Sequence, residues 1–223
     1  MNRREFLSSS ASVAIATGAF VSGAAPALAQ DRYGPARDWD IGPFIRGRNY
    51  SVGMPAHPTA SGRGWFFDFP GPRRRDGHVH YVTRQTGPLD MARGIRMRYR
   101  IDARRGARFV PQEHPDQPAT LSLYFQQAGD DWSGRGDGRF ARWYSPRRRQ
   151  FPLTPGEHEI TVMFDENWLS VMGSDRASLP REFARALANA GRVGITFGSR
   201  RARGHGVFAT APARFTLLDF RVI

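Results

Sequence analysis

Residues 94–102 read Gly-Ile-Arg-Met-Arg-Tyr-Arg-Ile-Asp, an uninterrupted alternation of apolar and charged side chains after the first glycine. Successive side chains of a β-strand point to opposite faces of its sheet, whereas a helix would scatter this pattern around its surface. The stretch therefore predicts a half-buried strand with one apolar face toward a core and one cationic face toward water.

The same period of two recurs along the chain, and clusters of Gly, Pro, Asp and Asn separate the runs. Further strand-like runs cover residues 65–69, 79–83, 121–125, 160–164, 192–198, 205–210 and 214–223. The last run carries apolar residues on both faces, which favours a central position in its sheet. Many short strands with turn residues between them predict an all-β fold, an antiparallel β-sandwich of the jelly-roll type.

One segment, residues 179–190, departs from this period because Phe183, Ala186, Leu187 and Ala190 recur at helical spacing. It predicts a single short helix near 179–190 between strands. Residues 30–63 are rich in Gly, Pro and Arg and carry only isolated aromatic residues, so we expect an irregular N-terminal arm there. The sandwich domain is then expected to cover residues 64–223.

The first 29 residues have the three regions of an export signal. Arg3-Arg4 precedes Phe6-Leu7, an apolar run follows, and the segment ends on small residues at positions 27 and 29. This order resembles the twin-arginine (Tat) signal, which implies the Tat translocase and a signal peptidase as partners during export. We expect cleavage between Ala29 and Gln30, a periplasmic or secreted location, and no stable membrane anchor, because the apolar run is shorter than the roughly 20 residues that span a bilayer.

The charge of the chain is strongly positive, with a formal net charge of +13 and 33 basic residues, all of them Arg. Export argues against nucleic acid as the partner of this charge. The arginines gather in three runs, 73–75, 147–149 and 200–203, each beside Gly, Pro or Ser. The runs are either solvated loop tips or contacts for anionic cell-envelope polymers, since guanidinium groups pair with carboxylate and phosphate oxygens. The chain has no cysteine, which excludes disulfides, thiolate metal sites and a cysteine nucleophile.

Two histidines, His78 and His80, are secondary candidates for metal ligands because residues two apart on a strand project from the same face. A metal site needs a third ligand, which Glu113 or His114 would have to supply through the fold. The alternative is that both imidazoles are hydrogen-bonded structural residues. We therefore predict no cofactor.

Paired carboxylates, such as Glu157 with Glu159 or Asp130 with Asp131, suit glycoside hydrolysis in principle. No surrounding motif identifies either pair as catalytic, and no Gly-x-Ser-x-Gly elbow is present. The catalytic residues, if any, are thus unknown from the sequence.

Aromatic and planar polar residues near the predicted strand ends suggest a sugar-binding site. An aromatic face packs against the C–H bonds of a pyranose, and amide, carboxylate or guanidinium groups bond its hydroxyls. The platform candidates are Trp132, Tyr144 and Trp168, and the polar candidates are Gln126, Asp131, Arg142 and His205. The alternative is that the tryptophans fill the sandwich core.

The Leu-Thr-Pro-Gly-Glu-His turn at 153–158, the helix, and the strands at 193–198 and 215–222 follow one another in an order that resembles the galactose-binding-like jelly roll of carbohydrate-binding modules. The resemblance is one of architecture and covers about 160 residues; the chain also resembles exported bacterial proteins with a twin-arginine signal. The jelly-roll resemblance implies polysaccharide binding on an aromatic-lined concave face and a structural calcium at a strand edge. Our leading hypothesis is an exported, non-catalytic β-sandwich that binds a glycan or an anionic envelope polymer. The alternatives are a polysaccharide hydrolase or lyase on the same fold, and a structural interaction protein of the envelope.

Overall fold

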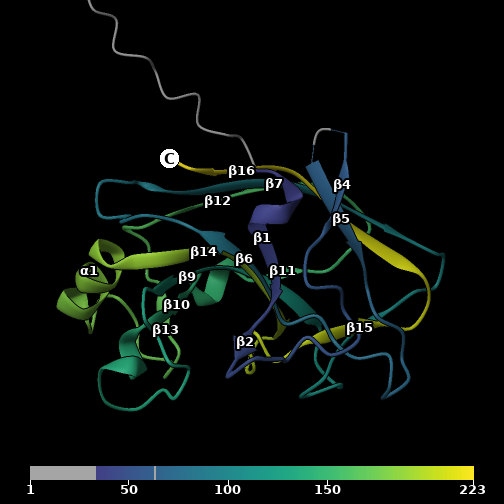
Figure 1. Cartoon of the computed structure of the whole chain (residues 1–223), viewed down its shortest axis with the longest axis horizontal. Helices are drawn as coiled ribbons and strands as arrows, with labels where there is room; N and C mark the ends of the chain where they lie inside the picture. Colours follow the sequence, from purple (N-terminus) through teal and green to yellow (C-terminus); the bar gives the residue numbers. More distant parts are fainter. Residues whose placement is uncertain (1–33, 63) are drawn as a thin grey trace, which may run out of the picture. The chain divides into compact units, whose positions relative to one another are not determined.

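Two antiparallel β-sheets pack face to face and form the predicted sandwich (Figure 1). The computed structural model describes residues 34–62 and 64–223. The first sheet contains, in spatial order, β1 (Trp39–Gly42), β6 (Tyr81–Gln85), β14 (Ala190–Ser199), β9 (Ala119–Gln127), β10 (Arg142–Tyr144) and β13 (Leu169–Ser170), with β11 (Phe151–Pro152) also paired to β9. The second sheet contains β12 (Gly156–Met163), β7 (Gly94–Ala103), β16 (Ala213–Val222), β5 (Gly64–Asp68) and β4 (Thr59–Ser61). We call them the seven-stranded and the five-stranded sheet.

Short elements complete the fold. Two small ribbons pair β2 (Phe44–Ile45) with β3 (Arg48–Asn49) and β8 (Phe109–Pro111) with β15 (Val207–Ala209). The helices are α1 (Pro180–Ala188) and the 3-10 turns η1 (Ala36–Asp38), η2 (Gly136–Phe140) and η3 (Arg147–Arg149). The predicted helix is therefore confirmed, although it ends two residues early because Ala190 already begins β14.

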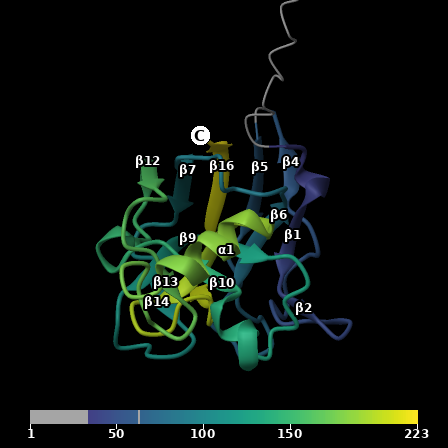
Figure 2. The ribbon, with the colours of Figure 1, turned by 90° about the vertical axis from the view of Figure 1, so that its left-hand side faces the viewer.

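The chain passes repeatedly from one sheet to the other, as in a jelly roll. Strands β5, β6, β7 and β9 alternate between the two sheets, and β14 and β16 again lie in different sheets. Figure 2 shows the strands of the five-stranded sheet side by side in the order β12, β7, β16, β5 and β4. The last strand, β16, lies between β7 and β5, so its predicted central position is confirmed.

The core lies between the sheets and is largely aromatic. The apolar residues of β7 are buried, as the alternation predicts, and Tyr99 stacks on Phe215 with 5.2 Å between ring centroids. Phe215 in turn stacks on Phe67 of β5 at 5.3 Å. Burying side chains of this size contributes about 1.5–3 kcal/mol each, which suits a fold without disulfides. Packing therefore holds the sandwich together.

The outer face of the five-stranded sheet is solvated and charged. Arg96 and Arg98 of β7 point outward and pair with Glu159 (2.6 Å) and Glu157 (3.4 Å) of β12. Exposed pairs of this kind contribute about 0–1 kcal/mol. The two glutamates therefore serve this charged surface and do not face each other across a cleft.

The predicted irregular arm at residues 30–63 is wrong where the structure describes it. Trp39–Gly42 forms β1, which pairs with β6 at the edge of the seven-stranded sheet. Trp39 is fully buried and packs edge-on against Trp65 (4.9 Å) and Phe220 (5.1 Å). The sequence gives no clear signal for β1, because the strand is too short for a clear alternation and is surrounded by Gly, Pro and Arg.

The expected export signal, residues 1–29, and its cleavage point lie outside the described residues. Within residues 34–62 and 64–223, no helix has the length and apolar character needed to cross a membrane.

Candidate functional site

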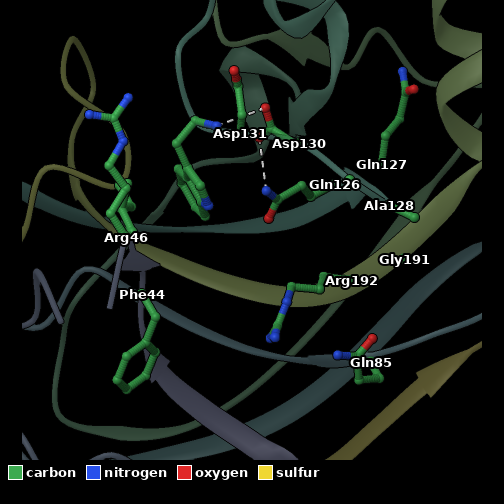
Figure 3. Close-up of a pocket in the computed structure, with 13 residues that line it drawn as sticks. Phe44, Arg46, Gln85, Gln126, Gln127, Ala128, Asp130, Asp131, Gly191 and Arg192 are labelled. Atoms are coloured by element: carbon green, nitrogen blue, oxygen red, sulfur yellow. Dashed lines mark hydrogen bonds between the residues drawn. The ribbon is translucent and has the colours of Figure 1, made fainter. Parts of the chain in front are cut away.

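A pocket of about 490 Å³ opens at one end of the seven-stranded sheet, where β9 ends and β14 begins (Figure 3). Its walls come from four parts of the chain: the β2–β3 ribbon, the end of β6, the end of β9 with the turn that follows, and the start of β14. The polar and charged lining residues are Arg46, Gln85, Gln126, Gln127, Asp130, Asp131 and Arg192, and the aromatic ones are Phe44 and Trp132. We call it the glutamine pocket.

The floor of the pocket continues into a buried polar network on the outer face of the sheet. Gln126 accepts a hydrogen bond from the Tyr124 hydroxyl at 3.0 Å through Oε1 and donates one to Asp130 Oδ2 at 2.8 Å through Nε2. The hydroxyls of Tyr81 and Tyr144 are 2.8 Å apart. Burial raises the pKa of Tyr81 and of Tyr124 well above the usual range, so both phenols stay neutral. The Gln126 amide is consequently held in one orientation.

Asp130 and Arg142 form a buried ion pair beside this network. The Asp130 side chain is fully buried and that of Arg142 is 9% exposed, and Arg142 Nε lies 3.0 Å from Asp130 Oδ2. The Nε–H does not meet the geometry of a hydrogen bond, so the contact is electrostatic. The Arg142 guanidinium also lies over the Trp132 ring, 4.9 Å from its centroid. The pair therefore supports the aromatic wall of the pocket from below.

The Trp132 backbone is constrained in an uncommon conformation. Its φ of +66° lies in the left-handed region, which bulky residues rarely adopt. Its N–H donates to Asp130 Oδ1 at 3.2 Å, and its ring packs edge-on against Tyr81 at 5.2 Å. The surrounding contacts hold this half-buried indole in place at the pocket wall.

Charged groups on the pocket wall are available to a ligand. Asp131 is exposed, and hydrogen bonds from the Ser133 backbone and side chain lower its pKa, so its carboxylate stays ionised. Across the pocket, Arg192 donates through Nη1 to Asp40 Oδ2 at 2.7 Å and to Thr83 Oγ1 at 3.3 Å. Figure 3 shows Asp130 and Asp131 on one side of the pocket and Arg192 with Gln85 on the other.

Three of the predicted ligand-binding residues, Gln126, Asp131 and Trp132, line this pocket. Arg142 lies beneath it, in contact with Trp132. Tyr144 is 3% exposed and bonded to Tyr81, so it belongs to the buried network and presents no platform.

The remaining two predicted residues lie elsewhere. Trp168 is fully buried in the sandwich core, and its ring centroid lies 5.4 Å from those of both Phe125 and Phe164. The prediction that Trp168 is a binding platform is therefore wrong. His205 is exposed and bonds Glu113 through Nδ1 at 2.9 Å, and it does not line the glutamine pocket. Core and platform tryptophans have the same sequence pattern beside a strand, so the sequence does not distinguish them.

The two metal-ligand candidates, His78 and His80, have ring centroids 6.3 Å apart. His80 Nδ1 donates to the Gly204 carbonyl at 3.0 Å, and burial lowers its pKa to about 4, so it holds the loop as a neutral imidazole. Burial lowers the pKa of His78 as well. Within the described part of the chain, no group of three or more His, Cys, Asp and Glu residues is placed to hold a metal ion.

Several pocket residues were not predicted from the sequence. Gln85 and Arg192 come from strands that are distant in sequence and meet only because β14 lies between β6 and β9. Asp130 enters the sequence analysis only as half of a carboxylate pair, although its position four residues after Gln126 is a usable signal for their contact.

Comparisons with models of known protein families, with curated proteins and with solved structures found no match to this chain. The proposed function therefore rests on the sequence and on the geometry of the site.

Proposed function

We propose that this protein binds a glycan in the glutamine pocket, as a non-catalytic module. The observation that supports this most is the convergence of Trp132, Gln126 and Asp131 in one open pocket. An aromatic wall beside planar amide and carboxylate groups is the combination that sugar recognition uses. The volume of about 490 Å³ also falls within the range of small-ligand sites.

The residues of the pocket divide naturally between the two surfaces of a sugar. The half-buried Trp132 offers an apolar ring to the C–H face of a pyranose. Gln85 and the ionised Asp131 accept or donate hydrogen bonds to hydroxyl groups around its edge. Because the supporting network already holds Gln126 and Trp132, little side-chain entropy is lost when a ligand binds.

Hydrolase and lyase chemistry are less well supported by the same pocket. Hydrolysis needs two carboxylates on opposite sides of the bond, one of them able to donate a proton. Here Asp130 is buried against Arg142, while Asp131 beside it has a lowered pKa and serves as an acceptor. Among the described residues that line the pocket there is no histidine to act with a tyrosine. Binding therefore accounts for the site better than catalysis does.

We also propose that binding takes place outside the cytoplasm. The support for export is the twin-arginine pattern in residues 1–29. A glycan of the cell envelope, neutral or anionic, would then be the ligand available to the pocket. The Tat translocase and a signal peptidase would act on the protein only during export.

Affinity electrophoresis of the purified protein in gels with neutral and acidic polysaccharides tests the proposal. We expect retardation by at least one neutral polysaccharide, and its loss in Trp132→Ala and in Asp131→Ala. Phe66→Ala is the matched control, because Phe66 is a half-buried aromatic on the outer face of the other sheet, under Arg214 at 3.7 Å. Asp131 is exposed, so its variant keeps the fold even if Trp132→Ala loses stability. Retardation by no neutral polysaccharide, or equal loss in Phe66→Ala, would refute the proposal.

A further inference from the structure

Two of the three arginine runs, 147–149 and 200–203, are about fifty residues apart in sequence and meet in space. They meet at a second pocket, of about 520 Å³, where β9 begins and β14 ends. Its arginines are Arg147, Arg148, Arg200 and Arg201, and its other polar residues are Gln117, Thr120 and Gln150. No Asp or Glu is among the described residues that line it. We call it the arginine pocket.

The fold brings the two runs together through strand β9. The first run forms η3, and the β11 strand that follows it pairs with β9 at Thr120 and Leu121. The second run follows β14, whose last residue, Ser199, pairs with Ala119 at the start of β9. The Ser145 hydroxyl donates to the Arg149 carbonyl at 2.8 Å, and the Ala202 N–H donates to Ser199 Oγ at 3.1 Å. Both turns are thus anchored to the sheet.

The charges of this pocket are not neutralised within the described part of the chain. None of its four arginines forms an ion pair with a carboxylate of residues 34–62 or 64–223, whereas their neighbour Arg149 pairs with Glu166 at 2.9 Å. Arg147 donates to the Gly173 carbonyl at 3.4 Å. The pKa of Asp175 is lowered mainly by hydrogen bonds from Ser178 and to a smaller extent by the charge of Arg147. Arg148, Arg200 and Arg201 form no ion pair with a carboxylate of the described residues.

Behind the pocket, Arg203 adds a further cation that is largely withdrawn from water. Its Nε and Nη2 donate to the Gln150 side-chain oxygen when that amide is turned toward them, and its guanidinium lies 6.0 Å from the centre of the Tyr144 ring. Burial, followed by repulsion from Arg147 and Arg200, lowers the pKa of Arg203 to about 10. Cations that repel one another at a partly buried position are stabilised by a bound anion.

We propose that the arginine pocket binds the oxyanion groups of an anionic polysaccharide. Guanidinium groups offer paired N–H donors that match the oxygens of carboxylate, sulfate and phosphate groups, and several of them converge here around Gln117 and Gln150, which can bond neighbouring hydroxyls. The third run, Arg73-Arg74-Arg75, lines neither pocket. These three arginines are exposed on a solvated loop and have no second arginine run beside them at a pocket.

The arginine pocket is separate from the glutamine pocket. Thr120 lines one and Gln126 the other, at opposite ends of β9, which at about 3.3 Å per residue places them roughly 20 Å apart. Each pocket therefore has its own prediction. A neutral glycan would use only the glutamine pocket, whereas the arginine pocket requires charge on the ligand.

The test compares two double variants that remove equal charge. Arg200→Gln with Arg201→Gln changes the pocket, and Arg73→Gln with Arg74→Gln changes exposed arginines outside it. Dissociation constants are measured calorimetrically at physiological ionic strength for alginate, which carries carboxylates, for dextran sulfate, for a teichoic-acid-type phosphodiester polymer, and for neutral dextran. The polymer that binds most tightly to the unmodified protein identifies the oxyanion.

We expect the pocket variant to weaken binding of that polymer about tenfold or more, because charge-assisted hydrogen bonds are lost, and the control variant to weaken it less than about twofold. Equal weakening in both variants would mean that overall charge alone attracts the polymer, and would overturn the proposal. Failure of all three anionic polymers to bind the unmodified protein would overturn it too. Trp132→Ala separates the two proposals, since it should leave the binding of the anionic polymer to the arginine pocket unchanged.

Discussion

The buried pair of Asp130 and Arg142 offers the sharpest test of how the glutamine pocket is built. Asp130→Asn keeps the shape of the side chain but leaves the Arg142 guanidinium, 9% exposed, without its counter-charge. Removing one partner of a buried ion pair costs about 3–5 kcal/mol. Because the contact at 3.0 Å lacks hydrogen-bond geometry, we expect the lower end, about 3 kcal/mol.

Urea denaturation of the protein and its variants measures this loss. In a thermal scan of a domain of this size, a loss of about 3 kcal/mol in the free energy of unfolding corresponds to a fall in melting temperature of roughly 6–12 °C. Asp131→Asn is the matched control, because it makes the same chemical change one residue along at an exposed position, and it should alter the free energy of unfolding by about 0.5 kcal/mol or less.

A second variant separates ion pairing from packing. Replacing both partners, as in Asp130→Leu with Arg142→Met, removes the stranded charge and should recover part of the lost stability. If Asp130→Asn stays within about 1 kcal/mol of the unmodified protein, the pair is not desolvated and the account of a pre-built pocket is refuted.

Three further results are expected. Trp168→Ala should lower the free energy of unfolding by about 3–5 kcal/mol, because the residue is fully buried, and should leave retardation by polysaccharides unchanged under native conditions, as affinity electrophoresis would check. The pKa of His80 is about 4 in the folded protein and 6.5 in the unfolded chain, so the unfolded chain takes up the proton first as the pH falls. The contribution of His80 to the free energy of unfolding should therefore be constant above pH 6.5 and decline between pH 6.5 and about 4. Urea midpoints measured across this range should decline less steeply in His80→Gln. Gly204→Ala should destabilise more than Gly106→Ala, because both have positive φ but only at Gly204 would the new Cβ collide with the Tyr81 hydroxyl; equal urea midpoints would contradict this.

Alternation predicted the longest strands well because one face of each must meet the core. Strand β7 is the clearest case, with apolar residues inside and arginines outside. The same reasoning could not find β1, since its Gly42 ends the strand after four residues. What holds β1 in the fold is a non-local contact, the packing of Trp39 on Trp65 and Phe220, and local sequence carries no sign of it.

The candidate site was predictable only where its residues are close in sequence. Gln126, Asp131 and Trp132 follow one strand and its turn, so their proximity could be inferred. The contribution of Gln85 and Arg192 depends on the strand order β6-β14-β9, which alternation does not determine. The meeting of two arginine runs depends on pairing at both edges of β9 in the same way.

The two sheets differ in how they treat their outer faces, and this difference bears on function. The five-stranded sheet turns exposed, paired arginines to water, which requires no covering loops. The seven-stranded sheet instead buries Tyr81, Tyr124 and Tyr144 with an aspartate and an arginine on its outer face. Apolar residues of similar volume would often stabilise such a site equally well or better, so stability alone does not explain a polar network there. A network in which the buried Gln126 and Asp130 hold Trp132 in position at an open pocket is explained if the Trp132 ring must meet a ligand.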